Sequence, residues 1–281
     1  MSTVFEQIVA ELSAAGIDAP RLEARLLIAS VLKKAPTLVF ADTTLNDAQL
    51  AKLNALLKQR LQHKPLDKIL GHREFYKSDF MVNENVLSPR PDTEILVEEA
   101  LRLLPDNNVK ILDLGTGSGC IIESLLAERQ KVSGVAVDIS AQSLAVAQKN
   151  AENLGISKRL QFIQADWFAD DFIKRIGEKF DMIVSNPPYI PTADISTLEP
   201  EVKNYDPRAA LDGGKDGFDS YKRIAAIAPN LLQDGGYILL EAGIGQAKQI
   251  AEICEQNGLK HIRTVADLSG IERCVILQKN K

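Results

Sequence analysis

Cysteine is scarce in this chain of 281 residues, which has only Cys120, Cys254 and Cys274. An odd number of widely separated cysteines excludes a disulfide scaffold, and the absence of CxxC spacing gives no zinc-binding pattern. We therefore expect reduced thiols and no metal site.

Long hydrophobic runs are also missing. No apolar stretch approaches the roughly 20 residues that cross a bilayer. The N-terminal sequence MSTVFEQIVAEL carries acidic residues where a targeting peptide would be basic. With 45% hydrophobic and 25% charged residues, the composition is that of an ordinary globular protein. The sequence predicts a cytoplasmic protein with no membrane partner.

An excess of basic charge is the third absence. The chain has 33 Lys and Arg against 38 Asp and Glu, a net charge of −5. Sequence-independent binding to nucleic acid depends mostly on basic side chains that neutralise phosphates, so no direct nucleic-acid partner is expected. Residues 1–75 carry a slight basic excess and the remainder an acidic one, which marks two different modules.

The apolar pattern divides the chain into three parts. Residues 1–64 show apolar side chains at helical spacing, which predicts a small all-α bundle ended by Pro65. In residues 65–91, REFYKSDFMVN alternates like a β-hairpin and LSPRPDT is punctuated by proline like a linker. From residue 92, after a helix at about 92–104, short β-rich runs alternate with helical stretches, which indicates a doubly wound α/β domain with a mostly parallel sheet.

Seven strands are expected in this last part. The final two are joined only by the short DLSGI segment, which leaves no room for a crossover helix, so that pair must be antiparallel. The expected strands are 109–114, 132–138, 160–165, 180–185, 236–241, 260–266 and 272–279.

The strongest local signal is the sequence DLGTGSG, from Asp113 to Gly119, which leaves the first strand and enters a helix. Glycines let a ligand approach the backbone, and the helix N-terminus favours the ligand's anionic end. The dinucleotide pattern GxGxxG would need glycine where Cys120 stands, which disfavours NAD. A glycine-rich turn without a ligand is the alternative.

Acidic and aromatic residues follow the next two strands. Asp138 ends the second strand, where a carboxylate can accept both hydroxyls of a ribose, or can cap the helix that starts near Ser140. Asp166 and Trp167 follow the third strand. We expect Trp167, the only tryptophan, to form an aromatic wall beside an adenine, with Asp166 accepting from the exocyclic amine. A lone tryptophan in the core is the alternative.

The fourth strand runs directly into Asn186-Pro187-Pro188-Tyr189. This stretch could be only a rigid turn, but it lies at the carboxyl edge of the strand expected beside the first, where open α/β sheets bind ligands. Asn186 Oδ1 and the Pro187 carbonyl can accept the two N–H bonds of a planar amide or aromatic amine. The prolines fix those acceptors in advance, and Tyr189 can stack on the planar group. Methyl transfer to such a nitrogen needs no prior general base.

Together, these motifs resemble the class I S-adenosylmethionine-dependent methyltransferases that methylate amino groups. More closely, the whole chain resembles the PrmC/HemK family, the protein-(glutamine-N5) methyltransferases of class-1 peptide chain release factors. The further motifs that carry this resemblance are GIDAPRLEARLLIA, PLDKILGHREFY, SPRPDTE, YDPRAALDGGKDG, EAGIGQ and DLSGIERCV. The pattern departs from the family near Lys68, where an aromatic residue is common, and at Ser88, where an aliphatic residue is common.

The resemblance implies a Rossmann-like seven-stranded sheet with an antiparallel last strand, preceded by the helical bundle and the hairpin linker. It implies three domains: 1–64 for substrate recognition, 65–91 as the linker and 92–281 for catalysis. The glutamine of the release factor's GGQ loop would be the substrate, methylation would modulate translation termination, and S-adenosylhomocysteine would be the second product. No metal is implied, and we expect a monomer. The implied cofactor residues are Gly115, Thr116, Gly117, Ser118, Gly119, Asp138, Asp166, Trp167 and Asn186, and the catalytic and substrate-binding residues are Asn186, Pro187, Pro188 and Tyr189.

Three other functions fit parts of the sequence. An adenine-N methyltransferase of DNA or RNA could use the same Asn and Pro acceptors, but the acidic charge argues against it. A glutamine methyltransferase of a ribosomal protein would share the NPPY sequence and differ in its N-terminal domain. A catalytically silent module that binds S-adenosylmethionine is disfavoured because Asn186 and both prolines are present.

Overall fold

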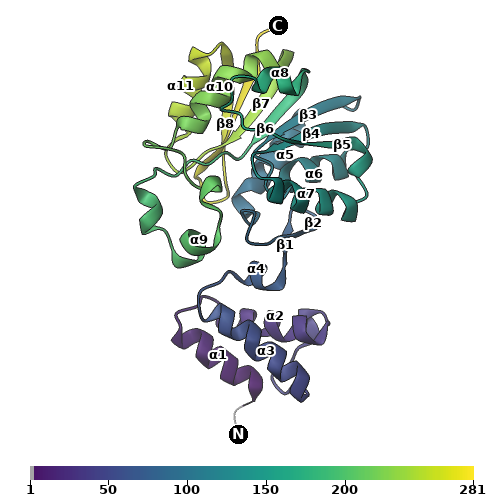
Figure 1. Ribbon diagram of the computed structural model, residues 1–281, viewed down its shortest axis with the longest axis vertical. Coiled ribbons are helices and arrows are strands. Elements are labelled where there is room, and N and C mark those ends of the chain that lie inside the picture. Colours follow the sequence, from purple (N-terminus) through teal and green to yellow (C-terminus); the bar gives the residue numbers. More distant parts are fainter. Residues whose placement is uncertain (1–2) are drawn as a thin grey trace. The chain divides into compact units, whose positions relative to one another are not determined.

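A computed structural model describes residues 3–281 of the chain (Figure 1). Contacts within the chain divide it into two compact units. The helical unit comprises the residues up to His72 together with Glu199–Tyr205, and the sheet unit comprises Arg73–Leu198 and Asp206–Lys281. Within the described residues, no helix is both long and apolar enough to cross a membrane.

The N-terminal residues form the small bundle that their apolar spacing predicts. Phe5 and Leu12 of the first helix pack with Leu27 and Leu53 of the next two, and all four are nearly inaccessible to solvent. Burial of each such side chain contributes about 1.5–3 kcal/mol. The third helix stops before position 63 because His63 has a φ of +60°. The elements of this unit are α1 (Val4–Ala14), α2 (Pro20–Leu32), η1 (Pro36–Leu38), α3 (Asp47–Arg60), α4 (Leu66–Leu70) and α9 (Pro200–Tyr205).

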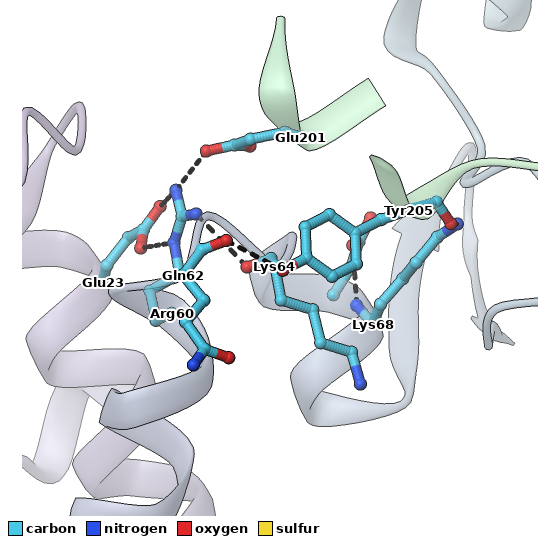
Figure 2. A network of polar contacts seen from close by, with 8 residues as sticks. Glu23, Arg60, Gln62, Lys64, Lys68, Glu201 and Tyr205 are labelled. Atoms are coloured by element: carbon cyan, nitrogen blue, oxygen red, sulfur yellow. Dashed lines mark hydrogen bonds and ion pairs between the residues drawn. The ribbon is translucent and has the colours of Figure 1, made fainter. Parts of the chain in front are cut away.

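A buried arginine joins α9 to the N-terminal helices (Figure 2). The guanidinium of Arg60 donates two hydrogen bonds to the Glu23 carboxylate, at 2.5 and 3.1 Å, and one to Glu201 of α9, at 2.7 Å. Its Nη1 donates to the Lys64 carbonyl at 3.2 Å. The Arg60 side chain is only 4% exposed. These partners, and not water, therefore stabilise the charge of the guanidinium.

The other end of α9 is fixed by two further hydrogen bonds (Figure 2). The Tyr205 hydroxyl donates to the Gln62 carbonyl at 2.8 Å, and the Lys68 ammonium donates to the Tyr205 carbonyl at 2.5 Å. A cation at the end of a helix satisfies a carbonyl that has no partner inside the helix. This contact gives the buried Lys68 a structural role at a position where the sequence departs from the family pattern.

The sheet unit contains a seven-stranded sheet with the order β5-β4-β3-β6-β7-β9-β8. β3 pairs in parallel with both β4 and β6, so the winding direction changes beside β3. β9 lies between β7 and β8 and is antiparallel to both, which confirms the predicted fold. The strands are β3 (Val109–Leu114), β4 (Val132–Asp138), β5 (Leu160–Gln164), β6 (Phe180–Ser185), β7 (Leu232–Glu241), β8 (Leu259–Ala266) and β9 (Glu272–Lys279), and a separate hairpin pairs β1 (His72–Phe75) with β2 (Ser78–Met81).

Helices cover both faces of this sheet (Figure 1). Leu112 and Ile111 are neighbours on β3 and so point to opposite faces. Leu112 packs in the cluster that contains Ile224 of α10, whereas Ile111 packs in the cluster that contains Ile122 of α6. The helices of the sheet unit are α5 (Glu94–Leu103), α6 (Cys120–Glu128), α7 (Ala141–Asn153), α8 (Phe172–Ile176), α10 (Asp219–Leu231) and α11 (Ala247–Gln256), with the short turns η2 (Pro91–Thr93), η3 (Ser157–Arg159), η4 (Asp194–Thr197) and η5 (Arg208–Ala210).

One strand starts earlier than its sequence pattern predicts. β7 begins at Leu232, whereas the pattern predicts residues 236–241. The pairing with β6 shifts register between the Phe180–Leu232 and Met182–Tyr237 pairs, and Gly235 lies in the shifted stretch with a φ of +79°. The sequence QDGG is typical of a turn, so the pattern predicts a later start for this strand. In the structure the strand continues through these residues with a bulge.

The Arg60 network predicts a specific loss of stability. Arg60→Ala leaves Glu23 and Glu201 without their cation, and we expect it to lower the free energy of unfolding by about 2–3 kcal/mol and to expose residues 199–205 to protease. Arg21→Ala is the matched control, because it removes an ion pair with Glu6 in which the arginine is 64% exposed, and it should cost less than about 1 kcal/mol. Urea denaturation and limited proteolysis measure both. Equal losses in the two variants would contradict the assigned role.

Candidate active site

The glycine loop after β3 is bound to the end of β4. The backbone N–H groups of Gly115 and Thr116 both donate to the Val137 carbonyl at 2.9 Å, and the Gly117 N–H donates to Asp138 Oδ2 at 2.9 Å. Gly115 has a φ of +73°, and a Cβ atom there would lie 3.0 Å from the Trp167 ring. This position therefore requires glycine for both its backbone conformation and its contact with Trp167.

A cavity of about 690 Å³ opens at this edge of the sheet. It brings together most of the predicted site residues, which come from the ends of β3, β4, β5 and β6. Gly119, Pro187 and Tyr189 are not part of its wall. The predicted residues that line it are Gly115, Thr116, Gly117, Ser118, Asp138, Asp166, Trp167, Asn186 and Pro188.

Asp138 connects the loop to the start of α7 without capping that helix. Its Oδ1 accepts from the Ser140 N–H at 2.9 Å, whereas the N-cap is Ser140 itself, whose Oγ accepts from the Ser143 N–H at 3.1 Å. Burial raises the pKa of Asp138, and the backbone bonds from Ser140 and Gly117 oppose that rise. Each carboxylate oxygen accepts one backbone bond and can accept another from a ligand in the cavity.

Asp166 and Trp167 also line this cavity. Asp166 Oδ1 accepts from the Phe168 N–H at 2.8 Å, which fixes the turn after β5. Trp167 is partly buried against the core, and its indole Nε1 has no hydrogen-bond partner among the described residues. Contact of Trp167 with an adenine stays a prediction.

Two buried carboxyls lie beneath the glycine loop, and the sequence pattern indicates a role for neither. Asp113 accepts from the Thr116 hydroxyl at 2.7 Å, and burial raises its pKa to about 7. Burial raises the pKa of Glu123 to about 9, and neither of its oxygens has a partner among residues 3–281. A Cβ atom at Gly119 would collide with the Glu123 carboxyl. Helical spacing places Glu123 on the inner face of α6, but sequence alone does not show that it lacks a partner.

Asn186 and Tyr189 have different surroundings. Asn186 lines the cavity, and its Nδ2 donates to the Thr93 hydroxyl at 3.3 Å. The Tyr189 carbonyl accepts from Gln246 at 3.0 Å, and its ring packs against the core. Burial raises the pKa of Tyr189 to about 12. Stacking of Tyr189 on a substrate stays a prediction.

Two segments of the cavity wall were not predicted. Residues 84–90, which the sequence pattern placed in the linker, and residues from Pro207 to Asp212 contribute to the wall. Arg90 joins the two segments through an ion pair with the buried Asp206 at 3.0 Å. The SPRPDTE and YDPRAALDGG motifs contain or adjoin these residues, so these motifs were the sequence features that could have indicated them.

Comparison with known proteins defines the class. A family model described as a methyltransferase domain matches residues 105–280, and one described as the PrmC N-terminal domain matches residues 3–71. A solved methyltransferase structure from Pyrococcus furiosus covers 74% of this chain and 91% of its own, with a TM-score of 0.55 and 16% identity, so the two share the fold. The sheet unit is a methyltransferase domain, and such domains use S-adenosylmethionine.

Two relatives define the family. A release factor glutamine methyltransferase of Rhodospirillum rubrum is 44% identical over 270 residues, which span 95% of this chain and 82% of the relative. One of Agrobacterium fabrum is 38% identical over 288 residues, which span 99% and 98% of the two chains. The chain belongs to the family of release factor glutamine methyltransferases, which confirms the resemblance found in the sequence.

The buried carboxyls predict that stability falls as the pH rises. The pKa of Glu123, about 9 in the folded protein, lies above its ordinary value of 4.5, so the folded state holds a proton that the unfolded chain releases. The stabilisation is therefore complete below pH 4.5 and is lost as the pH rises toward 9, by at most about 1.4 kcal/mol per pH unit. Between pH 5 and pH 8, the free energy of unfolding of Glu123→Gln should therefore rise by at least about 1 kcal/mol relative to that of the parent.

Urea denaturation at the two pH values measures this gain. Glu255→Gln, at an exposed position of α11, is the control and should shift stability equally at both. A parallel pH dependence of Glu123→Gln and the parent would refute the assignment.

Proposed function

We propose that this protein transfers the methyl group of S-adenosylmethionine to the side-chain amide nitrogen of the glutamine in the GGQ loop of class-1 release factors. The observation that carries the proposal is that Asn186 lines the same cavity as the glycine loop and Asp138. Membership of the release factor glutamine methyltransferase family supports the choice of substrate. The acidic charge balance and the PrmC-type N-terminal match favour it over a nucleic-acid or ribosomal-protein substrate.

The residues of the cavity fit the proposed cofactor. Gly115 lies directly against the Trp167 ring, whose buried indole N–H has no hydrogen-bond partner among residues 3–281. We assign residues 115–119, Asp138, Asp166 and Trp167 to hold S-adenosylmethionine, with Asp138 accepting from its ribose hydroxyls. When bound, the cofactor supplies a methyl group activated by a positively charged sulfur.

We assign the substrate amide to Asn186 and Pro187. Asn186 Oδ1 and the Pro187 carbonyl accept its two N–H bonds, which aims the nitrogen and weakens the delocalisation of its lone pair. Pro187 and Pro188 restrict the backbone torsions, so the acceptors need no reorganisation when the nitrogen becomes positively charged. The proton leaves after methylation, and the products are N5-methylglutamine and S-adenosylhomocysteine.

We assign recognition of the release factor to residues 1–64, with 65–91 as the linker and 92–281 as the catalytic domain. The match of the PrmC N-terminal model to residues 3–71 supports this division. The membership of α9 in the helical unit adds a short segment from the catalytic part of the sequence to the proposed recognition surface.

Asn186→Ala tests the amide site. It removes one acceptor, and we expect kcat to fall by about 10²-fold or more while cofactor affinity changes little. Turnover is measured on a purified release factor, mass spectrometry of the GGQ peptide identifies the methylated atom, and calorimetry gives the affinity. Asn153→Ala, at an exposed position of α7, is the control. Parent-like turnover in Asn186→Ala would remove the residue from the mechanism.

Asp138→Ala tests the cofactor site. It removes the proposed ribose acceptor and the bond that orients Gly117, so we expect the dissociation constant for S-adenosylmethionine to rise about 10- to 100-fold. Asp170→Ala, at an exposed position, should bind like the parent. Calorimetry measures both, and an unchanged dissociation constant in Asp138→Ala would refute the ribose assignment.

A further inference from the structure

Two buried residues beside Asn186 belong to motifs that the proposed function leaves without a role. Thr93 comes from SPRPDTE, and Glu241 begins EAGIGQ at the end of β7. Each is 2% exposed. The Thr93 hydroxyl accepts from Asn186 Nδ2 at 3.3 Å. Both side chains lie near enough to the Glu241 carboxyl to stabilise its charge, and its buried Oε2 has no hydrogen-bond partner among residues 3–281. These three side chains form a small polar cluster at the edge of the cavity.

The direction of the Asn186 amide matters for the reaction because its two ends have opposite hydrogen-bonding character. Oδ1 accepts, and Nδ2 only donates. A substrate amide brings two N–H groups, so only Oδ1 can hold it, and the reversed amide would place its own NH₂ against the NH₂ of the substrate. The oxygen and nitrogen of an asparagine are nearly equal in size, so packing does not distinguish the two orientations. Hydrogen-bond partners must do so.

The cluster supplies that distinction. An ionised carboxyl only accepts hydrogen bonds, whereas a hydroxyl both donates and accepts. An ionised Glu241 can therefore take only the Thr93 proton, which leaves a Thr93 lone pair to accept from Asn186 Nδ2. We propose that Thr93 and Glu241 are positioning residues that fix the Asn186 amide with Oδ1 toward the substrate nitrogen, an inference that rests on the proposed function of the site.

The charge of Glu241 sets the direction of the relay. If Glu241 takes up a proton, its hydroxyl can donate to Thr93, Thr93 can donate to Asn186 Oδ1, and the amide reverses. Burial raises the pKa of Glu241 to about 7, against the bonds from Thr93 and Asn186 and the charge of Arg273. Reversal is therefore expected as the pH falls below neutrality.

The charged groups near Glu241 are paired with one another. Arg273 of β9 is paired with Asp92 at 2.8 Å and with Asp267 at 3.2 Å. Burial raises the pKa of the four neighbouring thiol and phenol groups, so they stay neutral. These groups are Cys120, Cys274, Tyr189 and Tyr221.

Paired substitutions of Thr93 test the relay. Thr93→Val keeps the shape and removes the hydroxyl, and we expect kcat on the release factor to fall about tenfold with little change in the affinity for S-adenosylmethionine. Thr93→Ser keeps the hydroxyl and should restore most of the turnover. If Thr93 mattered only for packing, Thr93→Ser, which lacks the methyl group, would lose more turnover than Thr93→Val. Parent-like kcat in Thr93→Val, or equal losses in the two variants, would overturn the proposal.

The pH profile tests Glu241. The kcat of the parent should rise as the pH passes through about 7, and Thr93→Ser should keep this rise. Glu241→Gln has no carboxyl to titrate, so the rise should disappear whichever end of its amide meets Thr93. A rise that persists unchanged in Glu241→Gln would remove Glu241 from the relay.

A measurement without turnover separates this inference from the proposed function. In protein labelled with ¹⁵N-asparagine, the Asn186 side-chain amide signal, identified by its loss in Asn186→Asp, should shift in Thr93→Val and stay near its parent position in Thr93→Ser. Identical spectra of the parent and Thr93→Val would overturn the relay. If the parent fails to methylate the GGQ glutamine, the proposed function falls, while the spectra still decide whether Thr93 holds the amide.

Discussion

The backbone around Tyr189 is enclosed so tightly that the neighbouring segments have room only for glycine. A Cβ atom at Gly213 would lie 2.8 Å from Tyr189 Cα, and one at Gly243 would lie 2.9 Å from the Tyr189 ring. The following residue, Ile190, receives a hydrogen bond from the Gly213 N–H at 2.8 Å. The chain therefore leaves β6 along a path with almost no freedom. The two glycines therefore restrict the path of the chain that follows Asn186, although neither lines the cavity.

The charge of the cavity wall suits a cationic ligand better than a phosphate. Five acidic residues line it, of which Asp212 is paired with Arg208 and Asp219 lies 3.8 Å from Lys222. Arg90 is the only basic residue of the wall in the described part of the chain, and it is paired with Asp206. A concentration of negative charge attracts cations and repels the phosphates of a dinucleotide or a nucleic acid. The sulfonium of S-adenosylmethionine has the favourable sign. The acidic members are Glu84, Asp138, Asp166, Asp212 and Asp219.

Sequence reasoning was most successful where the pattern is local and repeated. Strand periodicity and the short DLSGI connection predicted the mostly parallel sheet and its antiparallel strand, and the glycine loop, Asp138 and Asn186 do meet at one edge. It failed where the deciding fact is a partner distant in sequence. Glu123 is recognisable as a residue on an inner helix face, but its missing partner is a property of the packed core. The bond from Asn186 to Thr93 spans 93 residues, which no periodicity reveals.

The placement of α9 also depends on partners distant in sequence, and it bears on the segment that follows NPPY. The chain pairs with itself at Ile190 and Asp212 in the sheet unit, and between these positions Glu199–Tyr205 belongs to the helical unit. Arg60 and Lys68 hold that segment through Glu201 and the Tyr205 carbonyl. The segment that follows NPPY thus begins in the sheet unit, enters the helical unit at Glu199–Tyr205, and returns to the sheet unit at Asp206. A change that loosens α9 from the helical unit acts on the loop between Ile190 and Asp212, which follows NPPY in the chain. Under the proposed assignment of residues 1–64 to recognition and of Asn186 to the glutamine, the two tasks are linked through the covalent continuity of the chain.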